Sequence, residues 1–365
     1  MGFRCGIVGL PNVGKSTLFN ALTRAGVQAE NYPFCTIDPN VGMVEVPDQR
    51  LPKIAEFIQP PRVIPAAIEF IDIAGLVSGA SRGEGLGNRF LAHIREVDAI
   101  AHVVRAFENP DVGHVADQVD PLSDIATVDT ELALADLETV ERALDKSLKG
   151  SKNGDKTQLQ MAHLLERVRA WLDRGAPIRS MALVQVERAA LKPLCLLTAK
   201  PVLYVSNVDE HDLDGGEGSN VAAVKAHAQI SGDELVLVSA RIEQEIAMLD
   251  HQERSVFLND LGLAESGLDR VIRAGYSLLG LRTFFTAGPK EARAWTIKSG
   301  MTASAAAGVI HTDFERGFIR AETIAYDDFV ALGGEQGARD AGRLRLEGRD
   351  YVVNDGDIMH FRFNV

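Results

Sequence analysis

The eight residues GLPNVGKS at positions 9–16 decide the fold. They match the pattern G-x-x-x-x-G-K-[ST] at every fixed position, after an apolar run at residues 3–8 and before a helix-like run at residues 16–24. Glycines at these positions let successive backbone N–H groups point inward, which forms an anion-binding nest at the start of a helix. A plain glycine turn before a helix is the alternative, but the strand and helix on either side favour a phosphate-binding loop.

The side chains that end this loop predict how a polyphosphate is held. We expect Lys15 to bridge the β- and γ-phosphates, Ser16 to bind Mg²⁺, and Thr17 to lie near the α-phosphate. The chain is therefore expected to bind a nucleoside triphosphate.

Apolar segments recur along the chain with helix-like stretches between several of them, which predicts a doubly wound parallel sheet in an α/β fold. The expected strands are residues 3–8, 66–73, 99–104, 202–206 and 235–239.

Two further regions depart from this alternation. Residues 123–195 space their apolar residues mostly by three or four around a polar turn at 150–155, which predicts an antiparallel helical hairpin; ordinary packed helices are the alternative. From residue 283 onward we expect a small α+β domain. Its expected strands are residues 295–297, 318–324, 351–353 and 358–363, and its expected helix is residues 303–310.

Two elements that sense the γ-phosphate follow the loop. Asp72 and Gly75 end the second apolar strand in the pattern D-x-x-G, so Asp72 is expected near Mg²⁺ through water and the Gly75 amide near the γ-phosphate. Thr36 is placed to complete the coordination of Mg²⁺, although a threonine at a strand edge would have the same spacing. The glycine-rich residues 79–87 are expected to form a second switch segment.

The loop that reads the base is expected after the strand at residues 202–206. GTPases have Asn-Lys-x-Asp there, whereas this chain has Val208 at the lysine position and Glu210 at the aspartate position, after Asn207. A guanine-selective site should not tolerate this change easily, so we expect relaxed base choice or a preference for adenine. Ser239 and Ala240 fit the last base-contact loop.

The residue that orients the attacking water is not evident. Many GTPases have glutamine directly after D-x-x-G, but Leu76 stands there and cannot hold water. His114 is the internal candidate, since a neutral imidazole can hold a water near pH 7; a surface histidine is the alternative. A partner or K⁺ could also supply the missing group.

Composition limits the class of protein. The net charge of −13 argues against wholesale binding of nucleic acid, and three separated cysteines form neither a disulfide framework nor a metal cluster. Without an apolar run of about 18 residues, we expect no membrane span and a cytoplasmic protein. Residues 270–298 nevertheless hold six basic residues against one acid, with Phe284, Phe285 and Trp295 among them. This strip could contact RNA phosphates and stack on bases, or it could be a core strand with solvated flanks.

Taken in order, these elements resemble the Obg-type translation-factor NTPases, and most closely the YchF/Ola subgroup. The resemblance rests on residues 2–17, 31–36, 72–76, 83–88, 283–288, 293–297, 311–320 and 355–359. It covers essentially the whole chain and implies three parts: a G domain at residues 1–122 and 196–282, an inserted helical hairpin at 123–195, and a C-terminal TGS domain of β-grasp fold at 283–365.

The resemblance also implies functions for these parts. Residues Asn12, Val13, Gly14, Lys15, Ser16 and Thr17 would cradle the phosphates, Ser16 and Thr36 would bind Mg²⁺, and the loop around Val208 would meet the base. Members of the subgroup hydrolyse ATP at least as readily as GTP and are linked to ribosomes and stress responses. We therefore expect a monomeric ATPase/GTPase that binds the ribosome or its large subunit through contacts that include ribosomal RNA. Leu76 leaves open a nucleotide-occupancy sensor with negligible turnover. A metabolic P-loop kinase is disfavoured, since no acceptor lid is evident.

Overall fold

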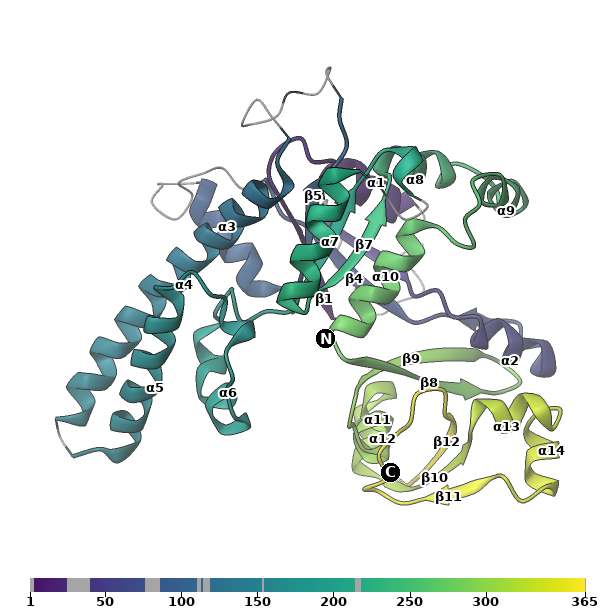
Figure 1. The fold of residues 1–365 in the computed structure, drawn as a ribbon. Helices are drawn as coiled ribbons and strands as arrows, with labels where there is room; N and C mark the ends of the chain where they lie inside the picture. Colours follow the sequence, from purple (N-terminus) through teal and green to yellow (C-terminus); the bar gives the residue numbers. More distant parts are fainter. Residues whose placement is uncertain are drawn as a thin grey trace. The chain divides into compact units, whose positions relative to one another are not determined.

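The computed structural model describes residues 3–24, 40–75, 86–109, 113, 119–152, 154–213 and 218–364. These residues cluster into two compact units. The described part of unit 1 falls within residues 3–24, 40–42 and 69–271, and that of unit 2 within residues 43–68 and 272–364. Figure 1 shows the helices and strands of both units.

The first sheet is doubly wound, as the alternation of apolar segments predicts. Its strand order is β2-β4-β1-β5-β6-β7, and the four neighbouring pairs from β4 to β7 are parallel. The strands are β1 (Arg4–Val8), β2 (Val41–Glu45), β4 (Ala67–Asp72), β5 (Ala99–Arg105), β6 (Val202–Asn207) and β7 (Glu234–Val238). Every residue of β5 and β6 is buried, because central parallel strands are covered on both faces.

Helices alternate with these strands or follow them. They are α1 (Lys15–Arg24), α3 (Leu86–Glu96), α7 (Ser219–Ser231), α8 (Ala240–Ile246), α9 (His251–Asp260) and α10 (Gly267–Leu278). Each of β1, β6 and β7 leads directly into a loop followed by a helix, so three such loops meet at one edge of the sheet.

A helical hairpin follows β5, as the spacing of apolar residues predicts. Helix α4 (Pro121–Ser151) is capped by Asp120, whose carboxylate accepts hydrogen bonds from two backbone N–H groups of the first turn. Helix α5 (Lys156–Leu172) is capped in the same way by Asp155 and lies beside α4 (Figure 1). The second arm is shorter than residues 123–195 suggested. Short helices fill the rest: η2 (Ile178–Ser180), α6 (Gln185–Leu191) and η3 (Lys192–Leu194).

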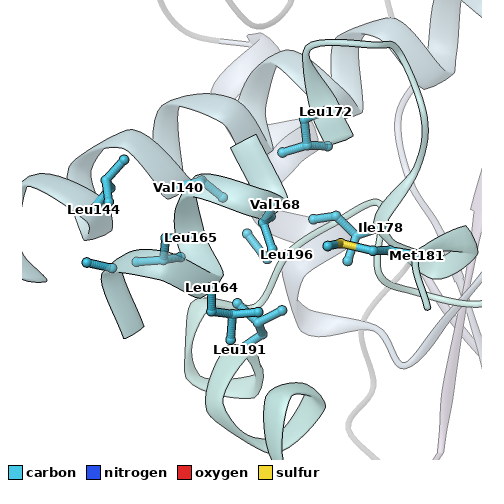
Figure 2. Packing of buried hydrophobic residues seen from close by; sticks show 11 residues of the cluster. Val140, Leu144, Leu164, Leu165, Val168, Leu172, Ile178, Met181, Leu191 and Leu196 are labelled. Atoms are coloured by element: carbon cyan, nitrogen blue, oxygen red, sulfur yellow. The ribbon is translucent and has the colours of Figure 1, made fainter. Parts of the chain in front are cut away.

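The hairpin has its own apolar core, shown in Figure 2. Val140 and Leu144 of α4 pack with Leu165 and Val168 of α5, all nearly inaccessible to solvent. The segment after α5 adds further apolar side chains to this core: Ile178, Met181, Leu191 and Leu196. Burial of this many apolar side chains gives the hairpin a fixed shape within unit 1.

One buried carboxylate fastens helix α4 to the segment before β6. Asp136 is 1% exposed and accepts hydrogen bonds from the backbone N–H of Leu197 (2.7 Å), the backbone N–H of Thr198 (2.8 Å) and the Thr198 hydroxyl (2.7 Å). The carbonyl of Thr198 in turn accepts from the Arg179 N–H at 2.9 Å. Asp136 therefore satisfies donors that would otherwise be buried without partners.

Replacing Asp136 with alanine is expected to lower the free energy of unfolding by about 3 kcal/mol, because three buried donors lose their acceptor. Urea unfolding followed by circular dichroism measures the loss. Asp145→Ala, at an exposed position of the same helix, is the control and should change stability by less than about 0.5 kcal/mol. Equal stability of the two variants would show that Asp136 is not an anchor.

Unit 2 contains a second sheet of order β11-β10-β12-β8-β9-β3. Its strands are β3 (Val63–Ile64), β8 (Leu281–Ala287), β9 (Ala292–Lys298), β10 (Phe318–Ile324), β11 (Arg345–Glu347) and β12 (Ile358–Phe363). Its helices are α2 (Arg50–Ile58), α11 (Ala303–Ile310), α12 (Thr312–Arg316), α13 (Tyr326–Ala331) and α14 (Glu335–Asp340). Ala303, Ala306 and Ala307 of α11 share a core with Phe284 and Phe361 of the sheet.

Residues 43–68 belong to this unit, which the sequence did not lead us to expect. Strand β3 pairs in parallel with β9, and Arg50 at the start of α2 lies over the Phe285 ring, 5.3 Å from its centroid. The Arg50 guanidinium also bonds Asp48 and Asp355, each at 2.7 Å. A segment from the N-terminal third of the chain is thus fastened to the C-terminal sheet. The three-part division at residues 122, 195 and 282 remains a prediction.

The expected strand at residues 351–353 is wrong. Val352 makes only an isolated bridge with Thr302. The segment from Tyr351 to Asp357 forms a turn instead. The Asp357 carboxylate accepts hydrogen bonds from the Tyr351 hydroxyl (2.8 Å) and from the Asn354 N–H (2.9 Å). The conformation is therefore set by a buried acceptor rather than by strand pairing. Among the residues that the structure describes, no helix has the length and apolar character needed to span a membrane.

Candidate nucleotide-binding site

The loop between β1 and α1 has the backbone shape that its sequence predicts. Asn12 has φ of 61° and Gly14 has φ of 96°, so the chain turns sharply before α1 begins at Lys15. The Leu18 N–H bonds the Gly14 carbonyl at 3.0 Å as the first turn of the helix forms. The free N–H groups at this helix start can receive an anion.

Lys15 is held inside the loop by the loop's own backbone. Its Nζ donates to the carbonyls of Gly9 (3.0 Å) and Leu10 (2.8 Å), and the residue is 7% exposed. Burial lowers the pKa of the Lys15 ammonium to about 8, while the negative charge of Asp72 acts in the opposite direction. Lys15 is therefore a buried cation whose ammonium could donate to a phosphate oxygen in place of the two carbonyls.

Asn207 joins the phosphate loop to the two loops after β6 and β7. Its Nδ2 donates to the Val13 carbonyl at 3.0 Å, and its Oδ1 accepts from the Ala240 N–H at 2.9 Å. A Cβ atom on Gly14 would lie 2.3 Å from this Nδ2. Glycine at position 14 therefore leaves room for the amide that fixes the three loops together.

A cavity of about 870 Å³ opens where these loops meet. This volume suits a small-molecule ligand. Ten of the residues predicted from the sequence line it: Asn12, Gly14, Lys15, Ser16, Thr17, Asn207, Val208, Glu210, Ser239 and Ala240. The structure thus brings the predicted phosphate loop and the predicted base loop to one cavity.

The predicted base-loop residues differ in how they face this cavity. Glu210 is exposed and begins the short helix η4 (Glu210–Asp212), so its carboxylate is free to meet a ligand. Val208 is 2% exposed and packs in an apolar cluster with Leu237 and Ile242. The valine therefore anchors the loop in the core. Val13 of the phosphate loop has a buried side chain and does not line the cavity.

Asp72 and Gly75 lie close to Lys15. Asp72 ends β4, and its Oδ1 is buried without a hydrogen-bond partner in the described residues. Burial raises the pKa of the Asp72 carboxyl, and the Lys15 charge opposes that rise. A Cβ on Gly75 would lie 3.0 Å from Nζ of Lys15. Three predicted phosphate and metal residues therefore meet at one end of the loop.

The remaining predictions for this site fall outside the described residues. They are Thr36, Leu76, His114 and most of the predicted second switch at 79–87. Gly113, next to His114, is described, and its carbonyl accepts from Nδ2 of Asn12 at 3.2 Å.

One wall of the cavity was not predicted. Phe107, Glu108 and Asn109, which follow β5, line it beside the base loop. The Glu108 N–H bonds Oδ2 of Asp209 at 3.2 Å, which ties this wall to the base loop. The only signal in the sequence was Arg105, a charged residue that ends a strand of mostly apolar residues.

Comparisons with known proteins cover the whole chain. A family model described as "50S ribosome-binding GTPase" matches residues 4–140, and the YchF-GTPase C-terminal model, described as "Protein of unknown function (DUF933)", matches residues 281–364. The Haemophilus influenzae protein named Ribosome-binding ATPase YchF is 58% identical over 366 residues, covering 100% of both chains. The chain belongs to the YchF family.

Other YchF proteins agree with this assignment. The Bacillus subtilis protein of the same name is 55% identical over 366 residues and 100% of both chains. The structure of the Schizosaccharomyces pombe YchF GTPase matches with a TM-score of 0.90 at 38% identity, covering 99% of this chain and 98% of that one. The resemblance to the YchF/Ola subgroup is confirmed, and with it a P-loop NTPase fold.

P-loop NTPases such as the YchF family imply Mg²⁺, and the residues present fit it. The orphaned Oδ1 of Asp72 and the hydroxyl of Ser16, which is exposed in the cavity, offer the hard oxygen atoms that Mg²⁺ prefers.

One part of the prediction for RNA contacts in this YchF-family chain is wrong. Phe284 and Phe285 are both 0% exposed, so they cannot stack on bases; they belong to the core of unit 2. Trp295 is half-buried, with the Arg293 guanidinium 4.1 Å above its ring centroid. Phe284 and Phe285 are neighbours on β8 and therefore point to opposite faces of the sheet. Both are buried because both faces are covered there, Phe284 packing with α11 and Phe285 lying beneath Arg50 of α2, which residue composition alone does not reveal.

Proposed function

We propose that the chain is a ribosome-associated ATPase of the cytoplasm that changes conformation with its nucleotide. The observation that supports this most is the single cavity lined by both the phosphate loop and a base loop with Glu210 at its mouth. The relatives at 55–58% identity are named ribosome-binding ATPases. A GTPase-like fold whose base loop is altered explains why such proteins are named ATPases.

The phosphate half of the site acts by positioning and by neutralising charge. The amides of residues 12–17 hold the phosphates, Lys15 bridges the β- and γ-phosphates, and the Gly75 amide senses the γ-phosphate. Ser16 and Thr36 would hold Mg²⁺, with Asp72 reaching it through water. When bound, Mg²⁺ supplies further positive charge to the phosphates. We propose that His114 orients the attacking water. Bound K⁺ is the alternative to His114 as the group that assists hydrolysis.

The base half of the site favours ATP over GTP. Asn207 holds the loops together, Ser239 and Ala240 close the base pocket, and Val208 fixes the base loop from the core. Glu210 carries its carboxylate one methylene farther than the aspartate with which GTPases accept two hydrogen bonds from guanine. Guanine therefore loses its best-placed acceptor, while adenine loses nothing.

Ribosome binding is proposed from the relatives' name and from where exposed positive charge lies. At the end of the hairpin Lys146, Lys149, Lys152 and Lys156 are exposed, and in unit 2 Arg282, Lys290 and Lys298 are exposed. Phosphate contacts with ribosomal RNA need such side chains, even in a chain of net charge −13. We propose that a monomer uses both regions on the ribosome or its large subunit.

The second candidate is a regulator that senses ATP by occupancy without turnover, because Leu76 replaces the usual water-orienting glutamine. Single-turnover hydrolysis of ATP, with and without ribosomes and in K⁺ or Na⁺, separates the two. We expect slow hydrolysis alone and roughly tenfold or greater stimulation by ribosomes. If the chain binds ATP tightly but hydrolyses none in all of these conditions, the sensor is favoured.

A further inference from the structure

Arg105 is a buried cation at the edge of the nucleotide cavity. It is the last residue of β5 and is 1% exposed. Burying a guanidinium costs free energy unless its donors are satisfied. Burial lowers the pKa of Arg105, and the carboxylates of Asp124 and Asp209 act in the opposite direction.

All the hydrogen bonds described for this side chain go to the backbone of one loop. Nε donates to the Phe107 carbonyl (3.3 Å), Nη2 to the Asn109 carbonyl (3.2 Å) and Nη1 to the Gly113 carbonyl (3.4 Å). The guanidinium also lies 4.5 Å from the centroid of the Phe107 ring. The guanidinium donates to the three carbonyls from three separate nitrogens in one rigid planar fork, which the single nitrogen of a lysine cannot reproduce.

The loop that Arg105 holds is the unpredicted wall of the cavity, formed by residues 107–109. Two further hydrogen bonds lead from the described residues of this loop to the loops that face the nucleotide. The Glu108 N–H bonds Asp209 beside the base loop, and the Gly113 carbonyl bonds Asn12 of the phosphate loop. Arg105 therefore contacts the loop close to the residues that bond the base loop and the phosphate loop.

We propose that Arg105 is a positioning residue for nucleotide binding: it touches no ligand, but it fixes the wall of residues 107–109 against which the nucleoside lies. This inference rests on the proposed nucleotide-binding function. It differs from a merely structural role because two of the three hydrogen bonds described for Arg105 go to the wall itself and the third goes to Gly113, which is bonded to Asn12 of the phosphate loop; none of the three goes to a neighbouring strand.

The test compares Arg105→Met and Arg105→Lys with wild type by equilibrium titration with ATP and with ADP. Methionine keeps an apolar stem and removes every donor, and lysine keeps the charge without the fork. We expect Arg105→Met to raise the Kd of ATP and ADP by the same factor, roughly tenfold, because the wall adjoins the base loop rather than the third phosphate. Arg105→Lys should be intermediate, and kcat at saturating ATP should stay within about twofold in both variants.

Arg179→Met is the matched control. Arg179 is another arginine of unit 1 whose side chain is largely covered (11% exposed); it is paired with Asp233 at 3.3 Å, and it does not line the cavity. Its loss should lower Tm and leave both Kd values unchanged. The inference is overturned if folded Arg105→Met, or Arg105→Lys where the methionine variant does not fold, binds ATP as wild type does or no worse than Arg179→Met. Failure of wild type itself to bind ATP would instead overturn the proposed function.

Discussion

Alanine at position 14 is expected to abolish nucleotide binding, raising the Kd of ATP by more than about 100-fold. Gly14 has φ of 96°, a backbone conformation that side chains other than glycine rarely adopt. A Cβ would also lie 2.3 Å from Nδ2 of Asn207, so the amide would have to move. Its bonds to the Val13 carbonyl and the Ala240 N–H would break together, separating the phosphate loop from the base loop.

A second glycine serves as the control for the free-energy cost of placing alanine at a positive φ. Gly154, in the turn of the hairpin, has φ of 80°, and a Cβ added there would meet nothing within 4 Å. Gly154→Ala should show only the stability loss caused by its backbone conformation, and it should bind ATP as wild type does. Both Kd values come from the same fluorescence titration, with Tm measured alongside. If Gly14→Ala bound ATP within about threefold of wild type, Asn207 would not be the tie that organises the site.

Replacing Lys15 with methionine should lower the rate of ATP hydrolysis by at least about 100-fold, because the β- and γ-phosphates lose the positive charge nearest to them. Methionine keeps the apolar stem that fills the loop. Lys200→Met is the matched control, since Nζ of Lys200 also donates to two backbone carbonyls, those of Arg95 and Val97. It does not line the cavity and should leave the rate unchanged. Wild-type turnover by Lys15→Met would remove Lys15 from the mechanism.

The pKa of Lys15 adds a second readout to this comparison. Its pKa in the free protein is lowered to about 8 by burial. Bound phosphates raise that pKa, so above pH 8 binding must take up a proton and the affinity for ATP should fall as pH rises, by up to about tenfold per pH unit. Below pH 8 the lysine is already protonated and contributes no such slope. Lys15→Met should not show this fall.

The parts of the site that the sequence predicted are those built by local backbone rules. The pattern at residues 9–16 needs only a strand, a glycine turn and a helix start, all of which are encoded within a short stretch. The loops at Asn207 and Ser239 could be located because parallel strands end at the same edge of a sheet. Local pattern and sheet geometry together therefore predicted one cavity from three separated segments.

The parts that the sequence did not predict depend on long-range partners. The wall at residues 107–109 has no motif, because Arg105 holds it through backbone carbonyls that any residue provides. Residues 43–68 join unit 2 through the two-residue strand β3 and through Arg50, which bonds Asp355. A two-residue strand has no periodicity to detect, and an ion pair across that much sequence leaves no local trace.

The most direct test of the proposed function is an equilibrium titration of the purified chain with ATP and with GTP in the presence of Mg²⁺, with Glu210→Asp measured alongside. The cavity and its altered base loop predict that ATP binds at one site per chain at least as tightly as GTP, and that Glu210→Asp shifts the ratio towards GTP. Failure to bind ATP, or a strong preference of the wild type for GTP, would contradict the account.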